Sequence, residues 1–441
     1  METLTFDTRK SFGGFKPMNG TNGGPLGKTH AKDQNVSNFD TYRAARIPFA
    51  RNHDANICGT VYGGPYVHDV SVIFPDFDAD PEDPASYFFE NTDADIQNTL
   101  NCGTVPFYRL GQSIEHQIRK LNVWPPKDFR KWAVICEHIV RHYTEGWADG
   151  FTYDMPYWEI WCEPDLLSGG ADLSRHLLWC GTDEQFYDFY ETAAKHLKAC
   201  FPQLKFGGPG LAHRLDWADA FLREMQRRGT PIDFFSWHCY TSRPEKIVET
   251  EEALRKILVK NGYSDAESIL NEYNYIRAWS GEDFIYSVTS HINEKGAAFV
   301  MACMTLGQQS GIDKLLVYDT RPSMYNNFFD YYTRRPLKGY YALYWYGCLY
   351  DCAYEIRPDR RLDGIYTLAG VKEDGKLLAV VTHYDDDDSA ADRELCLDFG
   401  RPGARYELYA VGREHSGELV AVTDSLQLRM PVNSVYFIKE C

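Results

Sequence analysis

The chain has 441 residues, which is more than one ordinary domain needs. Hydrophobic residues make up 44% of it, enough for a sizeable core, and charged residues make up 25%. Its formal net charge of −17, without any Lys/Arg cluster, argues against nucleic acid or an anionic membrane as a partner, because both are negatively charged. Twelve cysteines without a C-x-x-C pair, no signal-peptide pattern and no membrane-length apolar run predict a soluble protein of a reducing, cytoplasmic compartment.

Short apolar or aromatic runs alternate with longer amphipathic stretches over the first 350 residues. The runs predict eight strands at 14–20, 46–54, 105–111, 157–164, 205–212, 233–240, 268–275 and 314–320. The stretches between them predict helices, including 127–143, 184–200, 215–229 and one that Pro336 opens.

Eight strand-helix alternations indicate an α/β fold with parallel strands, and the count of eight favours a closed (β/α)₈ TIM barrel. An open, doubly wound sheet is the alternative. That fold would be favoured by a G-x-G-x-x-G loop after the first strand, and the sequence has none there.

The pattern changes after about Tyr354 to short runs with a two-residue alternation, separated by turn residues. We therefore expect the barrel to span residues 13–353 and a small antiparallel β-sandwich domain to span 354–441. The acidic run Asp385–Asp388 is interpreted as a solvated hairpin turn rather than a calcium loop, because the EF-hand spacing is absent.

Two of the predicted strands end in a glutamate. Strand four gives Trp-Glu-Ile-Trp-Cys-Glu-Pro, which ends at Glu163 and Pro164, and strand seven gives Ile-Leu-Asn-Glu-Tyr, which places Glu272. Reactive residues of such barrels lie at the C-terminal ends of the strands, so these carboxyls can meet across the mouth. A separation of about 5–5.5 Å would indicate a retaining glycosidase and about 6.5–9.5 Å an inverting one. Sequence alone leaves both open.

This chemistry requires one carboxyl that is protonated near neutral pH and one that stays ionised. Tyr240, at the end of strand six, is a plausible donor to Glu272, and His238 would line the same rim. Glu159 lies roughly 13 Å deeper than Glu163 at about 3.3 Å per residue, so we interpret it as structural, paired with Arg51 or Arg109.

The motifs on five strands resemble those of glycoside hydrolase family 39, a family of retaining barrels, in the order in which that family has them. The resemblance covers about residues 12–350. It rests on Phe15-Lys16-Pro17-Met18-Asn19-Gly20, Arg51-Asn52-His53-Asp54, Trp158 to Pro164, Gly207-Gly208-Pro209, His238-Cys239-Tyr240 and Asn271-Glu272-Tyr273.

This resemblance implies that Glu163 is the acid/base and Glu272 the nucleophile of a covalent glycosyl-enzyme mechanism. His53, His238 and Tyr240 would bind sugar or orient Glu272. The substrate would be a small carbohydrate or glycoside, with an exo-acting β-xylosidase as the first expectation, and no metal or organic cofactor is implied. Residues 1–12 would join the sandwich, and a homo-oligomer is left open.

One position departs from the family pattern. Cys162 stands where the family has an Asn that usually holds the sugar 2-hydroxyl, and a thiol is a weak donor. Either activity is reduced, another group such as Asn271 substitutes, or the substrate differs at that hydroxyl. Cys162 and Asn271 are thus candidate substrate-binding residues. Strand eight ends in Tyr318-Asp319 where many relatives place Trp, which leaves the sugar-stacking platform unassigned.

Two other classes of function compete with hydrolysis. A non-catalytic or weakly active carbohydrate-binding barrel is favoured by Cys162, and a scaffold without any sugar site is the third interpretation.

Overall fold

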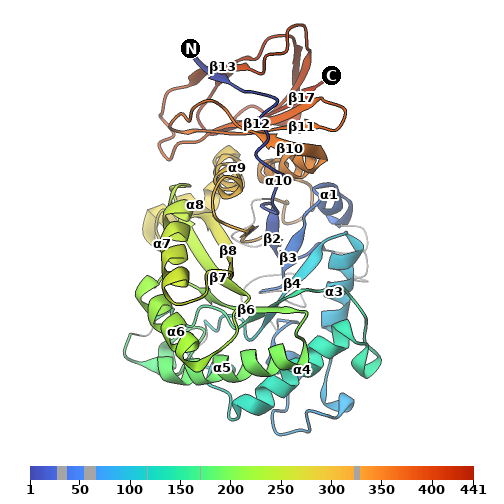
Figure 1. Cartoon of the computed structure of the whole chain (residues 1–441), viewed down its shortest axis with the longest axis vertical. Coiled ribbons are helices and arrows are strands. Elements are labelled where there is room, and N and C mark those ends of the chain that lie inside the picture. Colours follow the sequence, from blue (N-terminus) through green and yellow to red (C-terminus); the bar gives the residue numbers. More distant parts are fainter. Residues whose placement is uncertain (27–36, 54–65, 117, 169, 322–327) are drawn as a thin grey trace.

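Eight parallel strands close into a barrel, which confirms the predicted (β/α)₈ fold (Figure 1). The computed structural model describes residues 1–441 except 27–36, 54–65, 117, 169 and 322–327. The barrel strands are β2 (Gly20–Asn22), β3 (Phe49–Arg51), β4 (Val105–Leu110), β5 (Tyr157–Ile160), β6 (Lys205–Leu211), β7 (Phe234–Thr241), β8 (Glu267–Tyr275) and β9 (Lys314–Val317). Predicted strand two was expected to extend to Asp54, which lies outside the described residues.

The first barrel strand differs from its prediction. The sequence pattern placed it at 14–20, whereas β2 begins at Gly20, where Thr21 pairs with Val317 of β9 and with Ala50 of β3. The preceding segment is held by side chains instead. Lys16 Nζ donates to the carbonyls of Gly307, Ser310 and Ile312.

Helices surround the barrel and end at recognisable signals. They are α1 (Phe39–Ala44), α2 (Val70–Ile73), α3 (Glu90–Asn101), α4 (Phe129–Thr144), α5 (Asp183–Cys200), α6 (Leu215–Arg228), α7 (Lys246–Lys260), α8 (Gly281–Ser290), α9 (Glu294–Gln308) and α10 (Lys338–Cys348), with short 3₁₀ turns at Pro84–Ser86, Trp147–Asp149, Leu173–Arg175 and Leu349–Asp351. Thr182 and Gln185 form a capping box at the start of α5. Gly229 ends α6 in the left-handed conformation, with φ of 64°.

The interior of the barrel is apolar at one end and polar at the other. Five aromatic or aliphatic side chains form a separate buried cluster inside it: Phe107, Tyr157, Phe234, Ile269 and Leu316. Further along the strands, toward their C-terminal ends, the inward side chains include Arg51, Arg109 and Glu159, all fully buried. A layer of charge therefore lies beneath the barrel mouth.

A second unit of antiparallel strands sits beside α9 and α10 at the top of Figure 1. Its strands are β10 (Cys352–Ile356), β11 (Ile365–Lys372), β12 (Leu377–His383), β13 (Arg393–Asp398), β14 (Tyr406–Val411), β15 (Ser416–Thr423), β16 (Gln427–Met430) and β17 (Ser434–Glu440). They form a six-stranded sheet and a smaller one, and the amino-terminal strand β1 (Glu2–Thr5) pairs in parallel with β13 in the smaller sheet. Leu4 and Phe6 enter the core between the sheets.

The acidic run differs in part from the expected solvated hairpin turn: Asp387 and Asp388 are exposed, but the run joins β12 and β13, which lie in different sheets, and it also contacts the barrel. Asp386 accepts hydrogen bonds from Tyr275 (2.5 Å), the last residue of β8, and from Arg277 (3.0 Å), two residues further on. Lys295 of α9, only 2% exposed, lies 2.9 Å from Asp388. These cations and hydroxyls lie about a hundred residues away in the chain, so the local sequence could not reveal them.

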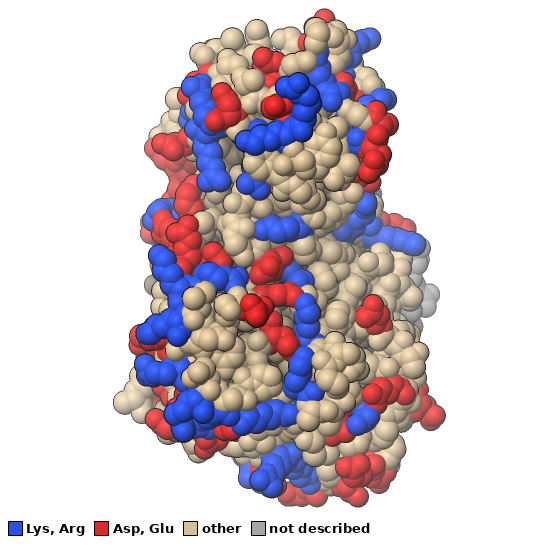
Figure 2. Space-filling view, viewed as in Figure 1, with Lys and Arg blue, Asp and Glu red and all other residues tan. Residues whose placement is uncertain are grey.

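Both signs of charge are interspersed over the face shown in Figure 2, without a continuous basic or acidic stripe. Among the described residues, no helix is both long and apolar enough to cross a membrane. All described cysteines are free thiols, whereas Cys58 lies outside the described residues.

Candidate active site

The two predicted carboxyls lie together at the C-terminal ends of the strands. Glu163 follows β5, Glu272 lies within β8, and His238 of β7 stands between them. His238 Nδ1 is 2.7 Å from Glu163 Oε1 and 3.4 Å from Glu272 Oε2. One oxygen of each carboxyl and a ring nitrogen of His238 all lie within 4.8 Å of one another. The mouth therefore brings a pair of carboxyls close enough to act on one bond.

The chain reaches Glu163 through an unusual backbone path. Trp161 and Glu163 both have positive φ, at 71° and 45°, which non-glycine residues adopt only when surrounding contacts impose it. Trp161 N donates to Leu110 O at 2.7 Å, and Glu163 N donates to Gly210 O at 2.9 Å. The neighbouring strands β4 and β6 thus hold the turn that aims Glu163 into the mouth.

Gly210 is required at its position on β6. Its φ is +65°, and a Cβ there would lie 3.3 Å from both Glu159 Oε1 and His238 Nε2. Only glycine allows the carboxylate layer and His238 to pack this closely against β6.

Glu272 is held by donors on both oxygens. Arg51 Nη1 donates to Oε1 at 2.6 Å, and the Tyr240 hydroxyl donates to Oε2 at 2.8 Å, the contact that the sequence suggested. The Glu272 side chain is only 6% exposed. Its orientation is therefore fixed by protein groups before any ligand arrives.

Arg51 also serves the deeper carboxylate. Its Nε donates to Glu159 Oε2 at 2.7 Å, one of the two pairings expected for this fully buried glutamate. Ser236 and Asn271 donate to the other Glu159 oxygen, each at 2.6 Å. Glu159 is therefore fully satisfied below the mouth and has no free oxygen to present to a substrate.

Asn271 and Arg109 point away from the bond-breaking position. Asn271 is fully buried and its amide nitrogen is committed to Glu159, so the structure does not bring it to the pocket surface as expected for a substrate-binding residue. Arg109, the other expected partner of Glu159, instead contacts Asp69 at 2.7 Å and His53 at 3.1 Å.

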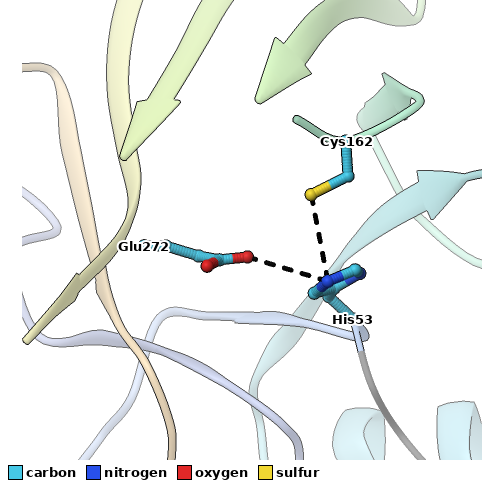
Figure 3. A group of neighbouring side chains, drawn as sticks. All are labelled: His53, Cys162 and Glu272. Atoms are coloured by element: carbon cyan, nitrogen blue, oxygen red, sulfur yellow. Dashed lines mark hydrogen bonds and ion pairs between the residues drawn. The ribbon is translucent and has the colours of Figure 1, made fainter. Parts of the chain in front are cut away.

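His53 lies between Cys162 and Glu272 (Figure 3). Arg109 Nε–H donates to His53 Nδ1, which places the ring proton on Nε2. That nitrogen lies 3.8 Å from Cys162 Sγ and 3.9 Å from Glu272 Oε1. Arg51 Nη2 donates to the same sulfur at 3.2 Å, so the thiol takes part in the hydrogen-bond network around Glu272.

Burial and neighbouring charges separate the proton affinities in this site. Burial raises the pKa of Glu163, although the hydrogen bond from His238 opposes the shift and the charge of Glu272 adds to it. Burial lowers the pKa of His238, but Glu272 and Glu163 outweigh it, and the net shift is upward. Burial, then Arg51 and Arg109, lowers the pKa of His53, which stays neutral. Burial likewise raises the pKa of the Cys162 thiol well above its usual range.

Side chains that could ligate a metal ion lie close together in this site, but the guanidinium of Arg51 already neutralises their negative charge. His53, Cys162 and Glu272 offer three such atoms within 4.8 Å of one another. The guanidinium of Arg51 contacts both Cys162 and Glu272, so a divalent cation would meet a buried positive charge. The cluster of His53, Cys162 and Glu272 is therefore an unfavourable site for a divalent cation.

Sequence reasoning missed two features of this site. It did not foresee that Arg51 reaches Glu272, since only the pairing with Glu159 was considered; the inward parity of Arg51 at the end of its strand is the signal that could have shown it. It also passed over Trp279, four residues beyond β8, because no periodicity marks a loop residue.

A closed (β/α)₈ barrel with two adjacent carboxyls at the C-terminal rim defines the class of glycoside-cleaving barrels. The sequence model described as glycosyl hydrolases family 39 matches residues 49–280, just over half of the chain, and includes every one of the site residues above. The chain belongs to glycosyl hydrolases family 39.

Similarity to individual proteins supports this placement. A β-xylosidase of Geobacillus stearothermophilus is 25% identical over 233 residues, and one of Caldicellulosiruptor saccharolyticus is 29% identical over 169 residues. These matches cover 46% and 35% of this chain and 44% and 31% of the relatives, so less than half of each relative's length is matched.

Solved structures share the fold over the whole chain. A glucosidase from Croceicoccus marinus superposes with a TM-score of 0.81 at 24% identity, covering 100% of this chain and 99% of its own. A monomeric β-xylosidase from Caulobacter crescentus CB15 gives a TM-score of 0.70 at 15% identity, again with 100% and 99% coverage. At these identities the likeness establishes the architecture.

Proposed function

We propose that this chain is a retaining O-glycosidase in which Glu163 is the acid/base and Glu272 the nucleophile. The observation that carries the proposal is the approach of the two carboxyls to within 4.8 Å. Inversion needs room for a water molecule and a gap of about 6.5–9.5 Å, whereas direct attack needs about 5–5.5 Å.

In the first step, Glu163 donates its proton to the departing oxygen while a Glu272 oxygen attacks the anomeric carbon. Burial raises the pKa of Glu163, which keeps the proton available near neutral pH. Arg51 and Tyr240 fix the attacking carboxylate. The bond to the leaving oxygen breaks as the bond to Glu272 forms.

In the second step, Glu163, now ionised, removes a proton from water, and the resulting hydroxide displaces Glu272 from the sugar. His238 donates to Glu163 and lies near Glu272, so it can stabilise the negative charge on whichever of the two carboxyls is ionised. His53, Cys162 and Tyr240 complete the wall around the sugar.

A terminal β-xyloside is the substrate proposed first. Two relatives named β-xylosidase support the sugar. Exo action is supported by the burial of the two carboxyls, since the side chains of Glu163 and Glu272 are only 15% and 6% exposed. A long chain passing through the mouth would need a more open groove.

The test compares the parent with Glu163→Gln and Glu272→Gln on a panel of aryl glycosides. The exposed Glu249→Gln on α7 is the matched control, because it removes the same charge from a side chain that pairs with Arg243 and contacts neither carboxyl of the site. We expect Glu272→Gln to lose at least about a thousandfold in kcat/KM on every substrate. Glu163→Gln should lose about a hundredfold or more on glycosides with poor leaving groups and least on those with activated leaving groups, with the control unchanged.

Two further measurements examine the mechanism. A 2-fluoro glycoside should add its glycosyl mass to the Glu272 peptide, and proton NMR should show a first product with the starting anomeric configuration. A parent protein that binds sugars but releases no aryl alcohol would point to the carbohydrate-binding alternative that Cys162 favours. An inverted first product would exclude the retaining mechanism.

A further inference from the structure

An exposed tryptophan stands at the barrel mouth beside the nucleophile strand. Trp279 lies four residues after β8, and 58% of its surface is exposed to solvent. Its ring centroid is 5.0 Å from that of Tyr240, with the planes at 72°. The two rings therefore meet edge to face, and more than half of the Trp279 surface stays exposed.

Trp279 belongs to a group that we call the mouth aromatics: Tyr240, Trp279, Phe284 and Tyr318. The ring of Phe284 in α8 lies 6.3 Å from that of Trp279. Tyr318, after β9, lies 6.5 Å from Tyr240 at 77° and is only 6% exposed. The inner members are packed into the wall, while Trp279 offers the outermost surface.

This group is connected to the bond-breaking position through one contact. The Tyr240 hydroxyl donates to Glu272 Oε2 at 2.8 Å, so Trp279 stands one side chain outside the nucleophile. The sugar attacked by Glu272 must lie in the closed part of the mouth, between the two carboxyls. The leaving group, which Glu163 protonates, then extends toward solvent, where Trp279 is exposed.

We propose that Trp279 is the platform on which the ring of a saccharide leaving group stacks, which makes it a specificity-determining residue. This inference rests on the proposed glycosidase function and adds a substrate class to it: short oligosaccharides rather than simple alkyl glycosides. The apolar C–H face of a pyranose matches a rigid indole surface, which binds it at little cost in conformational entropy.

The experiment compares two substrates with the same transferred sugar and different leaving groups. Xylobiose leaves a sugar ring that can stack, whereas xylosyl fluoride leaves an ion that cannot. For Trp279→Ala we expect kcat/KM to fall about tenfold or more on xylobiose and less than about threefold on the fluoride. Trp279→Phe should lie between the parent and the alanine variant.

Trp124→Ala is the matched control. Trp124 is also a half-exposed tryptophan, 43% exposed, on the segment after β4, and no contact in the described structure joins it to Tyr240. Its loss should leave the ratio of the two substrates unchanged. Equal losses on both substrates in Trp279→Ala would overturn the proposal, since they would mean that Trp279 only steadies Tyr240. An unchanged xylobiose rate would overturn it as well.

A binding measurement separates this inference from the proposed function. Calorimetry with xylobiose and xylose on the Glu163→Gln background, with and without Trp279→Ala, needs no turnover. The platform predicts weaker binding of xylobiose alone. If the parent hydrolyses no glycoside, yet Trp279→Ala selectively weakens xylobiose binding, the platform proposal is supported and the glycosidase proposal is contradicted. If xylobiose binds equally well with and without Trp279→Ala, the platform proposal is contradicted.

Discussion

At the scale of single residues, the guanidinium of Arg51 neutralises more than one carboxylate of the site. Its fully buried guanidinium contacts Glu159, Glu272, Asn22 and Cys162, so one cation compensates two carboxylates beneath the mouth. Breaking a buried ion pair by removing one partner is strongly destabilising, because the remaining charge stays buried without compensation. Arg51 is therefore expected to stabilise the fold and to hold Glu272 in place.

Replacing Arg51 by Met should lower the free energy of unfolding by about 3–5 kcal/mol and lower kcat. Urea denaturation and aryl-glycoside kinetics measure the two effects. Arg223→Met on α6, where the side chain is 66% exposed, removes a cation without burying a charge and should change neither quantity appreciably. Full stability in Arg51→Met would contradict the role assigned to this cation.

The pH dependence of activity should follow Glu163. Because its pKa is raised by burial, kcat/KM should persist to higher pH than for an ordinary glutamate and fall as the pH rises through the raised pKa. The hydrogen bond from His238 opposes the shift, so His238→Phe should move this basic limb to still higher pH. A limb that moves to lower pH would contradict the assignment. Glu163→Ala, assayed with an activated leaving group, should have no such limb.

Cys162 offers a gain-of-function test. Its buried, neutral thiol donates weakly, so a sugar hydroxyl beside Glu272 loses the hydrogen bond that an amide could provide. Cys162→Asn should raise kcat/KM on a 2-hydroxy glycoside relative to its 2-deoxy counterpart by about 5–150-fold, equivalent to about 1–3 kcal/mol. Cys162→Ser is the isosteric control. If the ratio stays the same in Cys162→Asn, the hydroxyl is held elsewhere.

At the scale of elements, local patterns predicted the positions that matter most. The ends of the predicted strands that correspond to β5, β7 and β8 predicted that Glu163, His238, Tyr240 and Glu272 share one rim, because parallel strands of a barrel end at the same face. The start of β2 was misplaced because the preceding apolar segment is held by side-chain contacts of Lys16 rather than by strand pairing. Patterns within one segment carry no information about such distant partners.

The same limit explains the contacts that the sequence could not show. Asn271 was expected at the substrate, but its choice of Glu159 depends on a side chain 112 residues away. The docking of the Asp385–Asp388 loop depends on Lys295 and Arg277, which belong to α9 and to the segment after β8. Residue identity at a strand end is readable from sequence, whereas the pairing of buried charges is a property of the assembled fold.

The docked acidic loop should therefore stabilise the chain. Lys295 is 2% exposed, with Nζ 2.9 Å from Asp388 and 2.7 Å from the Asp386 carbonyl. Asp388→Ala would leave this ammonium buried with weaker compensation, but Asp388 itself is 54% exposed and Lys295 keeps its contacts to Asp386, so we expect a loss of about 1–2 kcal/mol in the free energy of unfolding. Adding Lys295→Met should restore part of it. Strictly additive effects in this double-mutant cycle would show that the pair is not coupled.

At the scale of the whole molecule, the first strand of the chain and its last eight strands lie in the same β unit, and the barrel strands come between them in the sequence. β1 lies beside β13 although the two strands are nearly 400 residues apart in the chain. The barrel helices α9 and α10 lie against the sandwich, as Figure 1 shows, and Trp345 of α10 stacks on Phe437 of β17 at 5.8 Å. We therefore propose that residues 1–12 belong with the carboxy-terminal strands and that the two units support each other.

This proposal predicts that a single change in β1 destabilises the distant active site. Leu4 is 1% exposed within the sandwich core, so Leu4→Ala should cost about 2–5 kcal/mol through the cavity that it leaves. If the sandwich and the barrel unfold together, the loss of glycosidase activity on heating should shift to lower temperature by the same amount as the loss of sandwich structure. Leu419→Ala on β15, where the residue is 48% exposed, should change the free energy of unfolding by no more than about 0.5 kcal/mol and should leave both transition temperatures nearly unchanged. Two separate transitions, with the one that abolishes activity unmoved in Leu4→Ala, would show that the barrel folds without support from the sandwich.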